Sequence, residues 1–140
     1  MPYVKLSHNL CMKKQNLVVS FSGGRTSAMM AYHIFNSAEY RSKYELLFIF
    51  ANTGKEREET LQFVHDCDVK WGLGTVWVES CVTLKHGVGL EALTTNFARA
   101  SRKGEPFEAV IEKLNHTRSS GVPCITAPYC SENLKRIPID

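Results

Sequence analysis

The stretch NLVVSFSGGRTS, residues 16–27, decides the fold of this 140-residue chain. Leu17, Val18, Val19 and Phe21 form a short apolar, β-branched run, which is typical of a central parallel strand covered on both faces. Ser22, Gly23 and Gly24 interrupt that run, and the residues that follow, AMMAYHIF, have the composition of a helix. The stretch therefore predicts a strand, a glycine turn and a helix in direct succession.

The glycine turn has the features of an anion site. Glycines tolerate positive φ and let the backbone approach a ligand closely. The first N–H groups of the next helix are unpaired and carry the positive end of its dipole, and Arg25 adds a guanidinium. Phosphate or sulfate is the expected occupant, with a purely structural turn as the alternative.

Two further apolar runs extend this unit into a sheet. YELLFIF at residues 44–50 and TVWVE at residues 75–79 read as strands, separated from their predecessors by helical segments. Right-handed crossovers place the carboxyl ends of such strands on one edge of the sheet. The loops after the first two strands, which include ANTG at residues 51–54, are therefore expected to lie together.

The remaining segments complete a single α/β domain over residues 1–140. Residues 1–15 read as an irregular extension, residues 36–42 as a polar connection, and residues 90–100 as a helix. Another helix begins near Glu56, whose acidic neighbours suit its first turn, and a further helix begins near Pro106. Glu59 and Thr60 are expected to shape the edge of the pocket.

Composition narrows the function classes. A hydrophobic fraction of 44% and a charged fraction of 22% describe an ordinary globular protein. The net charge of +3 suits a small anionic ligand and is too small and scattered to indicate nucleic acid. No apolar run reaches the roughly 18 residues of a membrane span, and no signal-peptide core is present. We expect a cytoplasmic protein without a membrane partner.

Cysteine usage indicates free thiols. The five cysteines are an odd number without secretory context, and their spacing does not suit zinc, so we expect neither a disulfide framework nor a native metal site. They are Cys11, Cys67, Cys81, Cys124 and Cys130.

The glycine turn resembles the PP-loop, SGGxxS, of the adenine-nucleotide α-hydrolase-like superfamily. Ser22, Gly23, Gly24 and Ser27 fall on that pattern. The superfamily contains ATP pyrophosphatases and sulfonucleotide reductases. Thr26 stands where many ATP pyrophosphatases carry aspartate, which favours the reductase-like branch.

Three later motifs strengthen the resemblance. NTGKEREET, residues 52–60, is similar to the DTGxxxPET signature of phosphoadenosine phosphosulfate (PAPS) reductases, with Asn52 in place of Asp and Glu58 in place of Pro. GEPF at residues 104–107 follows, and PYCSENLK then carries Cys130 and Lys135. In this order the motifs resemble a branch of the PAPS reductase family often found in bacteriophage genomes.

The resemblance implies a Rossmann-like three-layer α/β/α fold with a mostly parallel sheet, shortened at the C-terminus. It also implies an adenine nucleotide, PAPS or ATP, as the ligand, whose phosphates Mg²⁺ could bridge. Cys130 stands alone at its motif, so no iron–sulfur cluster is expected. The residues implied at the phosphate or sulfonate end are Ser22, Gly23, Gly24, Arg25, Thr26 and Ser27, and those implied at the adenosine side are Asn52, Thr53 and Gly54.

Catalysis is less clearly implied than binding. Lys135 would place a charge on the phosphosulfate and Cys130 would act on it, against alternatives of a surface lysine and a buried small side chain. The family's C-terminal cysteine tail has no counterpart here, although sulfonyl transfer needs a nucleophile. Two functions stay open: a reductase-like or nucleotide-hydrolysing enzyme, and a non-catalytic phage protein that binds or sequesters a nucleotide and acts through a partner. In a shortened sheet, a second subunit could cover the exposed edge.

Overall fold

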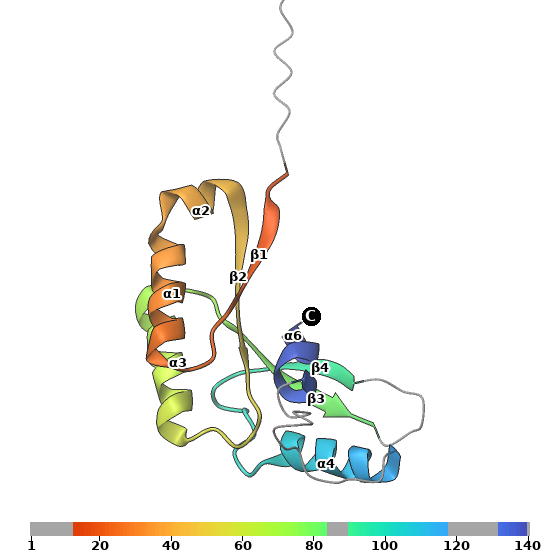
Figure 1. Ribbon diagram of the computed structural model, residues 1–140. Coiled ribbons are helices and arrows are strands. Elements are labelled where there is room, and N and C mark those ends of the chain that lie inside the picture. Colours follow the sequence, from red (N-terminus) through yellow and green to blue (C-terminus); the bar gives the residue numbers. More distant parts are fainter. Residues whose placement is uncertain (1–12, 84–89, 118–131, 140) are drawn as a thin grey trace, which may run out of the picture.

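The computed structural model describes residues 13–83, 90–117 and 132–139, and these form an α/β fold around one four-stranded sheet (Figure 1). The sheet order follows the chain. β1 pairs with β2 and β2 with β3 in parallel, and β4 joins β3 antiparallel. The predicted α/β class and mostly parallel sheet are confirmed. The prediction of a central first strand covered on both faces is wrong, because β1 is at the edge of the described sheet and Val18 on it is 45% exposed. The strands are β1 Gln15–Ser20, β2 Tyr44–Ala51, β3 Val76–Val82 and β4 Leu90–Thr95.

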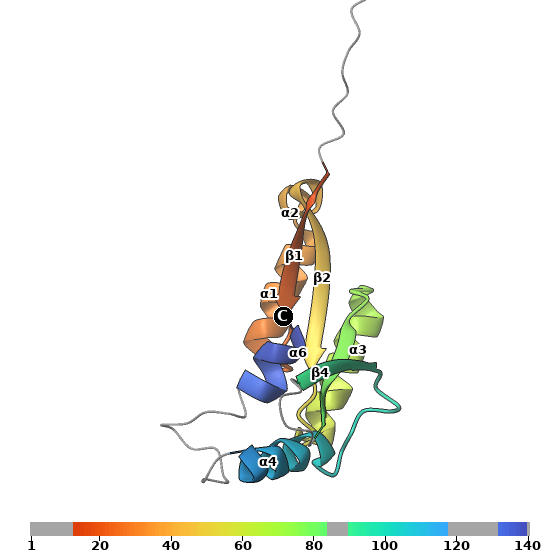
Figure 2. The same cartoon turned by 90° about the vertical axis from the view of Figure 1, so that its right-hand side faces the viewer.

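Helices connect and flank these strands. α1 and α3 lie together on one side of the sheet, while α6 lies on the other side against β2, β3 and β4 (Figures 1 and 2). α4 packs against β3 and a π-helix, η1. The helical elements are α1 Arg25–Asn36, α2 Ala38–Lys43, α3 Glu58–Trp71, α4 Glu105–Thr117, η1 Glu132–Arg136 and α6 Ile137–Ile139.

The core is built on the alternation of side chains along β2. Phe48 and Phe50 point to the α1 and α3 side, where they join a large apolar cluster with Leu61 of α3. Ile49 and Ala51 point to the opposite side and pack with Val78 of β3 and the C-terminal Ile139. The carboxyl half of β2 is therefore buried on both faces, as the continuous apolar run predicts.

The polar connection predicted at residues 36–42 contains a helix, α2, so that part of the prediction is wrong. Ser37 caps this helix by accepting the Tyr40 N–H at 3.4 Å, and Lys43 pairs with Glu39 at 2.7 Å one turn away. A cap and one i,i+4 pair stabilise a short helix only locally. Six residues, most of them polar, give too little hydrophobic periodicity to indicate it in advance.

The helix predicted over residues 90–100 is also wrong. Residues 90–95 form β4, in which Leu90 pairs with Val82 and Thr95 with Trp77 of β3. This pairing also carries β3 beyond the five residues predicted. A short segment with mixed leucine and threonine suits either conformation, and the neighbouring strand decides between them.

Candidate functional site

The predicted loops meet at one edge of the sheet. After β1 ends, the Phe21 N–H donates to the Ile49 carbonyl at 2.8 Å, and after β2 ends, the Asn52 N–H donates to the Val78 carbonyl at 2.9 Å. Both backbones therefore stay in register just before they turn. The starts of α1 and α3 lie side by side beyond this edge (Figure 1).

Gly23 brings the glycine loop close to α3. Its φ is +80°, and a Cβ at this position would lie 2.6 Å from Thr60 Cγ2. Only glycine combines that backbone conformation with so close an approach. Within the loop, Ser22 Oγ donates to Ser27 Oγ at 3.1 Å and Ser27 Oγ donates to the Gly24 carbonyl at 2.8 Å. These hydroxyls fix the shape of the loop.

We predict that Gly23→Ala destabilises the fold by about 2 kcal/mol, since it adds backbone strain and a clash with Thr60. Gly72 offers a matched control, because its φ is +68° but a Cβ there would meet nothing within 4 Å. Gly72→Ala should cost about 1 kcal/mol from strain alone. Urea unfolding measures both variants. Adding Thr60→Ser should recover part of the stability that Gly23→Ala loses, because it removes the Cγ2 that the new Cβ would meet. Equal losses of stability in the two glycine variants would contradict the close approach.

The α1 N-terminus is uncapped by any side chain. Gly24 is the N-cap residue, with φ −90° and ψ 155°, and no side-chain hydrogen bond closes this end. The first N–H groups of an α-helix have no partner within it and attract an anion. A Cβ at Gly24 would meet only Ser22 Oγ and Ser27 Oγ, at 3.9 and 4.0 Å. Residue 24 thus faces free space at the helix start.

An open cavity of about 610 Å³ lies at this point, between the glycine loop and the start of α3. Arg25 and Arg57 bring positive charge to it and Glu59 brings one carboxylate. Arg25 and Arg57 are both exposed, and neither has a side-chain partner among the described residues. The lining residues are Gly23, Gly24, Arg25, Arg57, Glu59, Thr60 and Phe63. The cavity therefore combines an uncapped helix, two free guanidiniums and one aromatic ring.

Part of this lining is predicted by the sequence. Glu59 and Thr60 were expected at the pocket edge and do line the cavity. Arg57 and Phe63 were missed. A usable signal for Phe63 existed, because it lies one helical turn after Glu59 and Thr60 on α3. Arg57 directly precedes α3. Its neighbours in the sequence are acidic, so the segment did not indicate a binding site for an anion.

The Asn52 side chain is hydrogen-bonded within the protein and does not face the cavity. Its side chain is fully buried, and its Oδ1 accepts the Gly54 N–H at 3.2 Å. Its Nδ2 donates to Glu79 Oε1 at 2.7 Å and to the Ser101 carbonyl at 2.9 Å. The amide is thus used within the chain, where it shapes the turn at residues 52–54. Neither Asn52 nor that turn lines the cavity beside Gly24.

The turn at residues 52–54 is held down by the segment that leads into α4. Gly54, with φ +78°, lies so close to this segment that a Cβ would be 2.8 Å from Pro106 Cδ. Lys55 Nζ reaches across to the Lys103 carbonyl at 3.3 Å and to Glu108 at 3.2 Å. The NTG and GEPF motifs therefore pack on one another, although they are about 50 residues apart.

Arg102 ties the same segment to the first turn of α3. Its guanidinium donates to both carboxylate oxygens of Glu58, at 2.7 and 3.1 Å, and to the carbonyls of Ala100 and Phe97. It also lies 5.1 Å from the centre of the Phe97 ring. The hydrogen bonds from Arg102 hold the pKa of Glu58 below its ordinary value of 4.5. The fork geometry suits an arginine and not a lysine.

This pair predicts a pH dependence of stability. Because the pKa of Glu58 is lower in the folded chain, its stabilisation is fully present above pH 4.5 and is lost as pH falls through the lowered pKa. Glu58→Gln should remove this contribution, so that wild type and variant converge in stability in acid. Urea unfolding from about pH 7 to about pH 3 tests it. Glu59→Gln is the control; a Glu58→Gln difference that persists unchanged in acid would contradict the ion pair.

The structure does not bring Lys135 to the cavity. Lys135 is exposed on η1, which packs against β3 and α4 through the buried Leu134. Ser80 of β3 also donates to the Asn133 carbonyl there. Lys135 is not among the cavity-lining residues. Cys130, like Cys11 and Cys124, lies outside the described residues.

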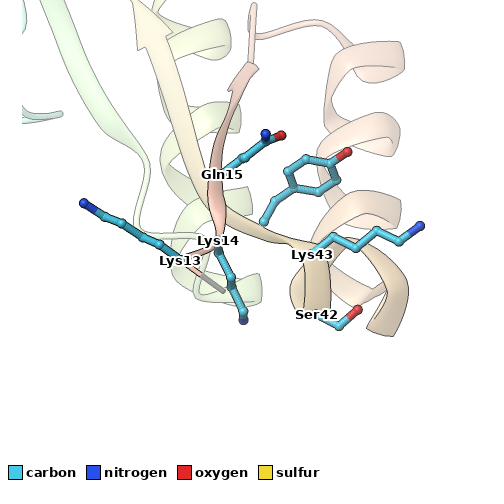
Figure 3. Close-up of a pocket in the computed structure, with 6 residues that line it drawn as sticks. Lys13, Lys14, Gln15, Ser42 and Lys43 are labelled. Atoms are coloured by element: carbon cyan, nitrogen blue, oxygen red, sulfur yellow. The ribbon is translucent and has the colours of Figure 1, made fainter. Parts of the chain in front are cut away.

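A second, basic cavity of about 530 Å³ lies at the opposite end of the sheet, beside the first residues of β1 (Figure 3). Lys13 and Lys43 extend in opposite directions in this view. Lys14 Nζ donates to the Arg41 carbonyl at 2.5 Å, and Lys43 is paired with Glu39. The ammonium groups diverge or are already bonded, so this cavity is a weaker candidate than the one at Gly24.

Thiols and carboxylates of the described chain do not add a metal centre. Cys67 and Cys81 are free thiols, and burial raises the pKa of the Cys67 thiol, with a smaller contribution from Asp66. Within residues 13–83, 90–117 and 132–139, no group of three or more His, Cys, Asp or Glu is arranged to hold a metal ion. No helix in those ranges is both long and apolar enough to cross a bilayer.

Comparison with known proteins adds no family assignment. No family model, curated protein or solved structure matches the chain. The features of the chain that bear on its function are the cavity at Gly24 and the motifs around it.

Proposed function

We propose that this chain binds an adenine nucleotide, with the phosphate or phosphosulfate of the ligand at the glycine loop. The observation that carries the proposal is the uncapped start of α1, where Gly24 faces an open cavity beside Arg25, which has no side-chain partner among the described residues. Free N–H groups, a helix dipole and a guanidinium together favour a phosphate-like anion. Under this proposal the fold is a Rossmann-like, PP-loop type of α/β fold.

The adenine part of the proposal depends on the resemblance of four motifs to the PAPS reductase family. Phe63 supports it, because its half-buried ring lines the cavity and offers a face on which a base can stack. Phe21 contacts this ring edge to face, with centroids 6.4 Å apart, and so holds it in place. Asn52, Thr53 and Gly54 do not line this cavity, so under the proposal they act on the nucleoside side through the shape of the turn that they form.

Reductive sulfonyl transfer is the catalytic form of the proposal. The Cys130 thiolate would take the sulfonyl group of PAPS, adenosine bisphosphate would leave, and an external dithiol would release sulfite. Lys135 would balance charge on the phosphosulfate. The non-catalytic alternative is favoured by one observation: neither Cys67 nor Cys81, the free thiols of the described chain, lines the cavity.

The binding site is tested by titrating ¹⁵N-labelled protein with ATP, AMP and PAPS in turn. We expect the amide signals of residues 23–27, 57, 59 and 60 to shift together with one saturating dependence. Shifts confined to residues 13–15 and 42–44 would instead place the ligand in the basic cavity and contradict the proposal. Sulfite release from PAPS with a dithiol, lost in Cys130→Ser while binding persists, would distinguish the enzyme from the binding protein.

A further inference from the structure

We infer that Arg57, at the start of α3, forms a second anion subsite across the cavity from Arg25, so that the ligand carries at least two linked anionic groups. This inference rests on the proposed function. It favours nucleotides that carry a diphosphate, a triphosphate or a phosphosulfate. Nucleoside monophosphates, which have one anionic group, are expected to bind less tightly.

The two arginines reach one cavity from separate elements. Arg25 is the first residue of α1 and Arg57 immediately precedes α3, and both line the same space together with Gly23 and Gly24. Each guanidinium is solvent-exposed and free of partners in the described chain. By contrast, Arg102 and Arg136 are engaged with carboxylates. Two unneutralised arginines on one cavity favour an anion large enough to contact both.

The position of Arg57 is fixed by its backbone. It is the N-cap residue of α3, its φ and ψ are −69° and 149°, and its carbonyl accepts the N–H groups of Thr60 and Leu61 at 2.9 and 3.2 Å. Thr60 also supports Gly23 through the close approach of the loop. The separation between the two arginine backbones is therefore set by packing, while their side chains stay free to close on a ligand.

Glu59 is expected to determine where in the cavity the anionic groups of the ligand lie. It is the single carboxylate among the lining residues, is exposed and has no ion-pair partner in the described chain. A like charge disfavours an anion close to it. The negative groups of the ligand are therefore expected to lie toward Arg25 and Arg57, and Glu59→Gln should strengthen anion binding by a few-fold.

Calorimetric titration of single-site variants tests the inference. The probes are AMP, ADP, ATP, inorganic phosphate and tripolyphosphate. Arg57→Gln is expected to lower the affinity for ADP, ATP and tripolyphosphate by about tenfold or more. Its effect on the affinity for AMP and phosphate should be less than about threefold. Arg25→Gln should weaken all five. Arg57→Lys should be intermediate, since it keeps the charge and loses the fork. Arg41→Gln, on α2 at the far end of the sheet, is the charge-matched control.

The outcomes separate the two proposals. If wild type binds ATP and tripolyphosphate, and Arg25→Gln weakens them while Arg57→Gln does not, the second subsite is wrong and the proposed function stands. Equal loss of AMP and ATP in Arg57→Gln would also overturn the second subsite, because it indicates a general field effect. If wild type binds none of the probes, the second subsite is wrong, and the proposed function fails with it if wild type does not bind PAPS either. Unfolding midpoints of the variants establish that each is folded.

Discussion

Gly24→Asp is expected to abolish nucleotide binding while leaving the chain at least as stable as wild type. Residue 24 is the N-cap of α1, its backbone is extended, and a side chain there has room. Aspartate is a better N-cap than glycine, so the helix should gain a few tenths of a kcal/mol. The same carboxylate would accept hydrogen bonds from the free N–H groups and repel an incoming phosphate. A loss of affinity of about 100-fold or more is expected in calorimetry.

Gly24→Asn is the matched control for this change. It places a cap of nearly the same size and shape without the negative charge, so it should stabilise α1 similarly and weaken binding less. The difference between the two variants isolates the charge. If folded Gly24→Asp binds the nucleotide as tightly as wild type does, the start of α1 is not part of the binding site.

Asn52→Asp is expected to destabilise the folded chain by about 3 kcal/mol or more at neutral pH. The Asn52 amide is fully buried and donates to Glu79 Oε1 at 2.7 Å and to the Ser101 carbonyl at 2.9 Å. Aspartate would remove both donors and set a second carboxylate against the first. The loss should shrink as pH falls, because protonation of one carboxyl relieves the repulsion. Urea unfolding at neutral and acidic pH measures it.

A double-mutant cycle with Glu79→Gln separates repulsion from the loss of hydrogen bonds. Glu79 also accepts the N–H and Oγ–H of Ser101, at 2.7 and 2.9 Å, so Glu79→Gln alone should be destabilising. In the double variant a glutamine amide can donate to the introduced carboxylate, and part of the Asn52→Asp loss should be recovered. Strictly additive losses would contradict direct contact between the two side chains.

Much of the fold could be predicted because the decisive signals are local. The apolar runs of β1, β2 and β3 are short, rich in branched or aromatic residues and separated by helical segments, and each became a parallel strand. β4 could not be predicted in this way. Its register with β3 depends on a partner strand, which propensity within the segment does not reveal.

The candidate site divides in the same manner. Gly23 is recognisable because a turn between a strand and a helix favours glycine, and its positive φ and close approach to Thr60 bear this out. The role of Asn52 was not recognisable, since its partner Glu79 lies 27 residues further along the chain. Glu79 also accounts physically for Asn52, where the resembled motif has aspartate: a carboxylate there would face another carboxylate.

The most direct test of nucleotide binding at the glycine loop is calorimetric titration of wild type and Gly24→Asp with ATP, AMP and PAPS under one set of conditions. The account predicts saturable binding of at least one of these nucleotides by wild type and its loss in the folded variant. Absence of binding by wild type, or equal binding by both proteins, would contradict it.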